Sequence, residues 1–169
     1  AMRADDFMDD ANLASCGRTT ALTEIGIMDG EGRLLPAGET GEIVARGDLL
    51  MSGYLDMPEV TAATLVDGWL HTGDVGTVDA RGFLFLKDRL RDVVISGGFN
   101  VYPSDVEARL AQHPAVHECI VFGVPDPKWG ERVEAAVQLR DGANTTPEAL
   151  IAFAREELGP VKTPKTIHF

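Results

Sequence analysis

The sequence places a carboxylate and a guanidinium in settings where each could bind a polar ligand. Asp74 lies between Gly73 and Gly76 in the segment GWLHTGDVG, whose other residues are mostly uncharged. A carboxylate on a tight glycine turn can accept two hydrogen bonds from a vicinal diol, and each such bond contributes about 1.5–3 kcal/mol when it is shielded from water. A turn-forming role is the alternative, because Asp is common beside Gly in turns.

Arg89 supplies the opposite charge. It lies in the segment DRLRD, between the apolar runs GFLFL and VVISGG. Its guanidinium presents a fixed fork of donors that fits diols and phosphates, and the apolar strand before it is expected to hold its backbone rigid. A surface ion pair with Asp88 or Asp92 is the alternative, and such a pair stabilises a protein only slightly.

Three further places could contact a ligand, and each has a structural alternative. Gly97 and Gly98 interrupt an apolar run, which predicts either a hairpin turn or a close approach of backbone amides to a ligand. Trp129 lies among charged residues in DPKWGER, where its ring would stack on a ligand or cover a local core. Lys162 and Lys165 in GPVKTPK could bind an anion such as phosphate, or form a solvated basic patch.

Composition and charge narrow the possible functions. The 169 residues are 44% hydrophobic and 25% charged, as in a globular protein, with no apolar run long enough to cross a bilayer. The formal net charge of −12 disfavours nucleic acid and anionic membrane surfaces as partners. Cys16 and Cys119 lack a metal-binding spacing and are expected to be reduced thiols. A cytoplasmic location is therefore expected, without a metal site.

The elements that must position these residues change in character near Arg91. From Ala21 to Arg89, short strand-like runs alternate with glycine-rich turns, and one short helix is expected near Pro58. This pattern predicts a small β-barrel-like subdomain. After Arg91, strands alternate with two helices, which predicts a compact α+β domain with a three-stranded sheet. The expected fold class is α+β, with domains at residues 1–90 and 91–169.

Local signals predict the ends of the two helices in the second domain. Ser104 and Glu107 have the S-x-x-E spacing of a capping box, which predicts a helix from Ser104 to about Gln112. Thr146 is expected to cap the other helix, and the Gly-Pro pair at 159–160 is expected to end it.

Four sequence blocks carry a resemblance to a known family. They are TGEIVARGDLLMSGYLDMPEVT, GWLHTGDVG, GFLFLKDRLRDVVISGGFNVYPSDVE and VFGVPDPKWGERVEAAV. In this order they resemble the C-terminal part of the adenylate-forming superfamily, and most closely its acyl-CoA ligases, from about Gly17 to Phe169. The resemblance implies a ligase that converts a carboxylic acid and ATP into an acyl-adenylate and pyrophosphate. Coenzyme A would then displace AMP to form a thioester, and the phrase GGFNVYP is more similar to fatty-acyl ligases.

The resemblance implies roles for three residues near the domain boundary. Asp74 and Arg89 match the family positions that contact the ribose of ATP or AMP. Arg91 matches the hinge about which the small domain moves between the two half-reactions. Family members usually carry Asp or Lys at the hinge, so Arg91 departs from the pattern. A hinge must stay solvated while its backbone dihedrals change, which suits a charged residue.

The resemblance also implies a coenzyme A site in the second domain. Gly97 and Gly98 match the loop that lines the pantetheine tunnel during thioester formation. Trp129 and Lys165 are similar to an aromatic and a basic position that contact coenzyme A.

The same resemblance implies that the chain is a fragment. The family's phosphate-binding loop and acid pocket precede the segment that matches, and the Mg²⁺ that accompanies ATP is expected to bind outside these residues. The family's adenylation lysine is expected beyond Phe169, so Lys162 and Lys165 do not correspond to it. No catalytic residue is therefore expected within the chain, and the isolated chain is expected to be inactive.

Two other functions remain open on the sequence. An adenylation domain of a peptide synthetase would transfer the acyl group to a carrier protein, but SGGFNVYPSDVE departs from the KIRGxRIE pattern of those domains. A non-catalytic module that binds a nucleotide or coenzyme A is the third possibility.

Overall fold

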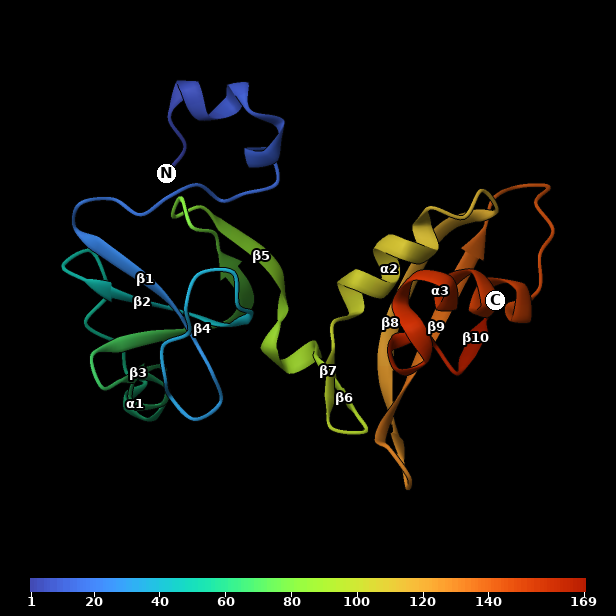
Figure 1. Cartoon of the computed structure of the whole chain (residues 1–169). Helices are drawn as coiled ribbons and strands as arrows, with labels where there is room; N and C mark the ends of the chain where they lie inside the picture. Colours follow the sequence, from blue (N-terminus) through green and yellow to red (C-terminus); the bar gives the residue numbers. More distant parts are fainter. The chain divides into compact units, whose positions relative to one another are not determined.

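The computed structural model describes residues 1–169 and divides into two compact units, residues 1–90 and 91–169 (Figure 1). The first unit contains η1 (Ala4–Met8), η2 (Asp10–Asn12), β1 (Thr23–Met28), β2 (Gly41–Gly47), α1 (Pro58–Thr64), β3 (Leu65–Val66), β4 (Trp69–Val78) and β5 (Leu84–Arg89). A short helix, η3 (Leu90–Asp92), contains the boundary between the units. The second unit contains β6 (Val94–Ser96), β7 (Phe99–Val101), α2 (Pro103–Ala111), β8 (Val116–Asp126), β9 (Gly130–Leu139), α3 (Pro147–Lys162) and β10 (Thr166–His168).

The first unit is built around β4, which pairs with three other strands. β2 pairs antiparallel with β4 along one edge, and β1 pairs antiparallel with β2 further out. β3 and β5 pair with different stretches of β4 and therefore share its other edge. The sheet curls into a half-barrel (Figure 1), which confirms the barrel-like subdomain predicted from the sequence.

A small apolar core fixes β2 against β4. Val44 of β2 is fully buried, and Trp69 of β4 and Met28 of β1 are buried beside it. The Arg46 guanidinium lies 4.4 Å from the Trp69 ring centroid and covers part of the ring. Burying an apolar side chain of this kind contributes about 1.5–3 kcal/mol. This core holds the strand that carries Asp74.

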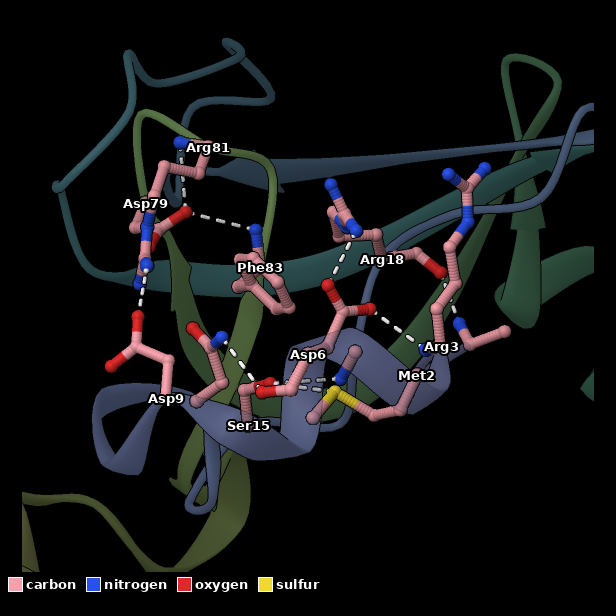
Figure 2. Close-up of polar contacts among 12 residues, drawn as sticks. Met2, Arg3, Asp6, Asp9, Ser15, Arg18, Asp79, Arg81 and Phe83 are labelled. Carbon is pink, nitrogen blue, oxygen red and sulfur yellow. Dashed lines mark hydrogen bonds and ion pairs between the residues drawn. The ribbon is translucent and has the colours of Figure 1, made fainter.

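Ion pairs order the acidic N-terminal segment (Figure 2). Arg18 Nη2 lies 2.6 Å from Asp6 Oδ1, and the Arg3 amide donates to the other Asp6 oxygen at 2.7 Å. Hydrogen bonds from the Arg3 amide and the Arg18 guanidinium hold the pKa of Asp6 below its usual value. Further along, Arg81 Nη1 pairs with Asp9 Oδ2 at 3.0 Å. Segment 1–20 therefore folds against the strands through the Asp9–Arg81 pair and through backbone hydrogen bonds of Cys16 and Gly17 with Leu84, although its sequence lacks a strand or helix pattern.

The second unit is built around β9. β8 pairs antiparallel with β9 along its whole length and forms a long hairpin with it. β10 pairs parallel with residues 134–136 of β9, and β6 pairs at Gly130, so β10 and β6 share the second edge. The β6–β7 hairpin thus extends the three predicted strands to five. Together with the helices, this confirms the α+β class.

Both longer helices pack on one face of this sheet (Figure 1). Val121 of β8 is 4% exposed on the covered face, whereas its neighbour Ile120 is 59% exposed on the other face. The core residues contributed by the helices are Val106 and Leu110 of α2 and Leu150 and Ala154 of α3, all fully buried. No helix of the chain has both the length and the apolar character needed to span a membrane.

The predicted N-terminal cap is confirmed for α3 and wrong for α2. Thr146 caps α3, because its hydroxyl accepts a hydrogen bond from the Ala149 amide at 3.2 Å. The prediction of a capping box at Ser104 is wrong. α2 begins at Pro103, and its cap residue, Tyr102, makes no side-chain hydrogen bond to the helix end. Proline suits the first helical position because its φ is preset and it lacks an N–H. The Glu107 carboxylate instead accepts the Val121 amide at 2.8 Å.

The predicted end of α3 at the Gly-Pro pair is confirmed as a break in the helix. Gly159 has φ of 71° and ψ of 176°, a conformation outside the helical region. A further helical turn follows it and ends at Lys162. Glycine adopts this conformation without the steric penalty that a Cβ would bring.

A buried carboxylate joins β10 to β9. The Glu134 side chain is 6% exposed and lies 2.8 Å from His168 Nε2 and 2.6 Å from Arg132 Nε. Hydrogen bonds from His168 and from Arg132 lower the pKa of Glu134. The negative charge is therefore stabilised where burial alone would disfavour it.

Candidate functional site

β4 departs from regular pairing with β2 at the residues that lead to Asp74. The pairs on either side of the irregularity are Val44↔His71 and Glu42↔Val75. Between these pairs β2 contributes one residue and β4 contributes three, so β4 bulges by two residues at 72–74. A bulge of this kind bends the strand and redirects the side chains that it carries.

Side chains replace the ladder hydrogen bonds that the bulge interrupts. The Thr72 hydroxyl donates to the Ile43 carbonyl at 2.7 Å and accepts from the Asp74 amide at 3.1 Å. Gly73 adopts a φ of 71°, and its amide donates to Glu42 Oε1 at 3.0 Å. The glycine is needed here because a side chain would be strained at this φ. Ile43 and Glu42 of β2 thus hold the backbone that leads into Asp74.

A second irregularity, in β5, determines which residue faces Asp74. The pairs Val78↔Leu84, Thr77↔Phe85 and Gly76↔Leu86 follow a constant register, but the next pairs are Val75↔Asp88 and Asp74↔Arg89. A constant register would have placed Asp74 opposite Asp88, and like charges directly opposite each other destabilise a sheet. The extra residue, Lys87, shifts the register by one and brings Arg89 to that position.

The structure therefore brings Asp74 and Arg89 together. Arg89 Nη1 lies 2.7 Å from Asp74 Oδ1, and the two side chains are 58% and 28% exposed. The pair presents a carboxylate acceptor and a guanidinium fork at one accessible place, which suits a ligand with neighbouring hydroxyl groups. The predicted alternative partner Asp88 accepts a hydrogen bond from the Arg89 amide at 2.9 Å.

In the second unit, the structure brings together Gly97, Gly98 and Trp129. The two glycines form the two-residue turn of the β6–β7 hairpin, with φ of 59° and 82°, as a type I′ turn requires. The Gly97 amide donates to the Trp129 carbonyl at 2.8 Å, and a Cβ on Gly97 would lie 2.9 Å from Trp129 Cε3. Trp129 is 42% exposed, and Lys128 Nζ lies 4.6 Å from the centroid of its ring. The ring is therefore both packed on glycine backbone and accessible to a ligand.

The basic residues near the end of the chain are held by backbone and acidic partners. Lys165 donates its amide to the Val133 carbonyl at 2.7 Å and its Nζ to the Pro160 carbonyl at 2.6 Å. Burial, and then the charge of Arg155, lower the pKa of Lys165. Lys162 Nζ lies 3.7 Å from Asp105 Oδ2.

Arg91 lies at the boundary between the units and is highly exposed. Its side chain is 84% exposed, and its Nε lies 3.5 Å from Asp92 Oδ1. It is the first residue of the second unit. An ion pair this exposed restrains the backbone little.

The sequence did not indicate Glu42, the residue that supports the bulge before Asp74. His71 Nδ1 lies 2.8 Å from Glu42 Oε2, so Glu42 contacts both His71 and Gly73. Glu42 is separated from them by 29 and 31 residues, and only the bulged register brings them together. Nowhere in residues 1–169 do three or more His, Cys, Asp or Glu side chains form a group that could hold a metal ion.

Comparison with known families gives two matches. Residues 1–55 match the family described as AMP-binding enzyme, and residues 105–169 match the AMP-binding enzyme C-terminal domain. The chain belongs to the AMP-binding enzyme family. This confirms the resemblance to adenylate-forming enzymes that the four sequence blocks carry.

Relatives within the AMP-binding family are similar over nearly the whole chain. A medium/long-chain-fatty-acid-CoA ligase of Mycobacterium tuberculosis is 44% identical over 157 residues, which are 93% of this chain and 28% of that protein. The amide bond synthetase of Marinactinospora thermotolerans is 45% identical with a TM-score of 0.85, over 98% of this chain and 34% of its own. The ATP-bound MatB of Rhodopseudomonas palustris is 35% identical with a TM-score of 0.86, over 92% and 31%. The chain spans about a third of the length of these relatives.

Proposed function

We propose that this chain is part of an acid-thiol ligase that makes acyl-CoA. In the first half-reaction, a carboxylate oxygen attacks the α-phosphorus of ATP, and pyrophosphate leaves. In the second, the thiol of coenzyme A attacks the acyl carbonyl, loses its proton and displaces AMP. The chain spans about a third of the length of its relatives, so it would carry only part of such a ligase. We assign to it the part that holds the nucleotide sugar and the acceptor thiol.

The pairing of Asp74 with Arg89 is the observation that carries this proposal. A ribose offers two neighbouring hydroxyl groups, which can donate to the Asp74 carboxylate while a hydroxyl oxygen accepts from the Arg89 guanidinium. The two side chains lie 2.7 Å apart on adjacent strands, so both can reach one sugar. The ion pair also holds each side chain near its bound position, which reduces the entropy lost when the nucleotide binds.

The acceptor site in this proposal lies in the second unit. The backbone of Gly97 and Gly98 and the Trp129 ring would pack along the pantetheine arm of coenzyme A. Lys165 would contact a phosphate of the same molecule. Arg91 would serve as the pivot between the half-reactions. The Mg²⁺ that accompanies ATP, and the lysine that promotes adenylation, are assigned to parts of the enzyme other than these residues.

A fatty acid is the proposed substrate of the ligase. The similarity to a ligase that acts on medium- and long-chain fatty acids supports this choice. A second function is favoured by the equally close similarity to an amide bond synthetase, in which the acyl group would pass to an amine. The two functions share the adenylation step and differ in the acceptor.

The nucleotide site is tested by measuring AMP affinity in the full-length enzyme. Asp74→Ala and Arg89→Ala each remove a charge-assisted contact of about 1.5–3 kcal/mol, so the Kd for AMP should rise about 10- to 100-fold. Arg33→Ala is the matched control, because it breaks another exposed Arg–Asp pair of the same unit, with Asp29 at 2.8 Å. Unchanged AMP affinity in both site variants would refute the assignment.

The acceptor is tested by titration with coenzyme A, a pantetheinylated carrier protein and an amine. The ligase proposal expects coenzyme A binding that Trp129→Ala weakens. Thioester formation should require coenzyme A, with an acyl-CoA product detected by mass spectrometry. Amide formation without coenzyme A would support the second function, and transfer to the carrier protein alone would favour a peptide-synthetase type of acceptor.

A further inference from the structure

Glu42 makes two contacts with the bulge that precedes Asp74. Its Oε1 accepts the Gly73 amide at 3.0 Å, and its Oε2 lies 2.8 Å from His71 Nδ1. A carboxylate only accepts hydrogen bonds, so the second contact requires a proton on Nδ1 of His71. One side chain of β2 therefore holds β4 on both sides of Thr72.

The contacts of Glu42 are partly shielded from water. The Glu42 side chain is 16% exposed and the His71 side chain is 27% exposed. A hydrogen bond to a charged group is stronger where water is excluded, and a buried N–H that loses its acceptor is costly. Removing the carboxylate would leave the Gly73 amide without its acceptor inside a strand that is already irregular.

The bulge also determines where Asp74 lies. Gly73 has a positive φ, and the Asp74 amide is held by the Thr72 hydroxyl, which is itself fixed to the Ile43 carbonyl. Relaxation of the Gly73 turn would rotate the peptide that leads into Asp74. The carboxylate would then move relative to Arg89, which is positioned by a different strand.

We infer that Glu42 is a positioning residue for the nucleotide site: by holding His71 and Gly73 together, it sets Asp74 against Arg89 in the geometry that binds the ribose. The inference rests on the proposed function of Asp74. Glu42 has no assigned contact with the nucleotide and acts through the backbone of β4.

The test measures AMP affinity of the full-length enzyme by calorimetry. Glu42→Ala removes both contacts and should raise the Kd for AMP at least tenfold. Glu42→Gln should stay within about threefold of the wild type. The glutamine oxygen can still accept the Gly73 amide, and its NH₂ can donate to His71 Nδ1 in the other tautomer. Rescue by glutamine separates the role of shape and hydrogen bonding from that of charge.

A double variant shows whether Glu42 acts through Asp74. In the Asp74→Ala background, Glu42→Ala should weaken AMP binding by less than twofold further, because the group that it positions is gone. Hydrogen exchange of the Gly73 amide should accelerate in Glu42→Ala and stay slow in Glu42→Gln. Thr72→Val, which removes the other anchor of the bulge with little change in shape, provides a second route to the same loss if Glu42→Ala folds poorly.

A matched control and three outcomes decide the inference. Glu24→Ala removes a carboxylate of the same sheet that pairs with Arg46 at 2.7 Å, and should leave AMP affinity unchanged. If Asp74→Ala weakens AMP binding but Glu42→Ala and Thr72→Val do not, only the role of Glu42 is overturned. Full additivity in the double variant would also overturn it. If Asp74→Ala leaves affinity unchanged, the proposed nucleotide site fails, and the role of Glu42 fails with it.

Discussion

The contact between Gly97 and Trp129 allows a sharp test through two neighbouring glycines. Gly97→Ala and Gly98→Ala each place a Cβ at positive φ, which costs about 1–2 kcal/mol. A Cβ at Gly98 meets nothing within 4 Å, whereas a Cβ at Gly97 would lie 2.9 Å from Trp129 Cε3. Ordinary carbon contacts need about 3.5 Å, so the ring must withdraw by about 0.6 Å or swing away.

The two variants should therefore differ by the effect on the ring alone. Gly98→Ala should lower the free energy of unfolding by about 1 kcal/mol, and Gly97→Ala should lower it by about 1 kcal/mol more. Urea unfolding is followed by Trp129 fluorescence in a Trp69→Phe background, because these are the two tryptophans of the chain. The emission maximum of the folded protein should shift to the red in Gly97→Ala and stay unchanged in Gly98→Ala.

Coenzyme A binding extends this comparison to function. If the Trp129 ring packs along the pantetheine arm, Gly97→Ala should weaken coenzyme A binding more than Gly98→Ala. Equal losses of stability together with an unchanged emission maximum in both variants would refute the reasoning, since the ring would then not rest on Gly97.

Two further predictions concern β9 and the boundary between the units. Because its partners lower the folded-state pKa of Glu134, its charge stabilises the fold above about pH 4.5, and this stability is lost as the pH falls through the folded pKa. Glu134→Gln should therefore flatten the acid side of a plot of unfolding free energy against pH, and a curve as steep as that of the wild type would contradict this. Arg91→Pro in the full-length enzyme should slow one half-reaction selectively by fixing φ at the proposed pivot. Equal slowing of ATP–pyrophosphate exchange and thioester formation would count against the pivot.

Much of the fold follows from local signals in the sequence. The cap at Thr146 and the break at Gly159 depend on residues that are adjacent in the chain, and both are confirmed. β9 also follows from the alternation of apolar residues at Val133, Ala135, Val137 and Leu139. The box at Ser104 failed because a stronger local signal, Pro103 at the first helical position, lies one residue earlier. Two helix-start signals in competition cannot be ranked by spacing alone.

The site could be predicted only in part. Residue types and glycine turns indicated Asp74 and Arg89 one by one, and only the family resemblance implied that both contact one ribose. Their direct pairing depends on the extra residue at Lys87, which no periodicity reveals. Glu42 was missed for a related reason, since a bulge changes which distant residues meet. Register irregularities are decided by tertiary contacts and lie outside what a local pattern encodes.

The parallel pairing of β10 with β9 has a consequence for the order of folding. The β8–β9 hairpin closes over residues 127–129, whereas β10 reaches β9 only after α3 has been traversed. Loop-closure entropy favours the hairpin as the earlier event and β10 as the later one. Until β10 arrives, residues 134–136 of β9 form an open strand edge on which another chain could assemble. A charged residue, Glu134, lies on that edge and disfavours such strand addition. We therefore expect Glu134, which anchors β10 through His168 in the folded unit, to lower the tendency of the partly folded unit to aggregate.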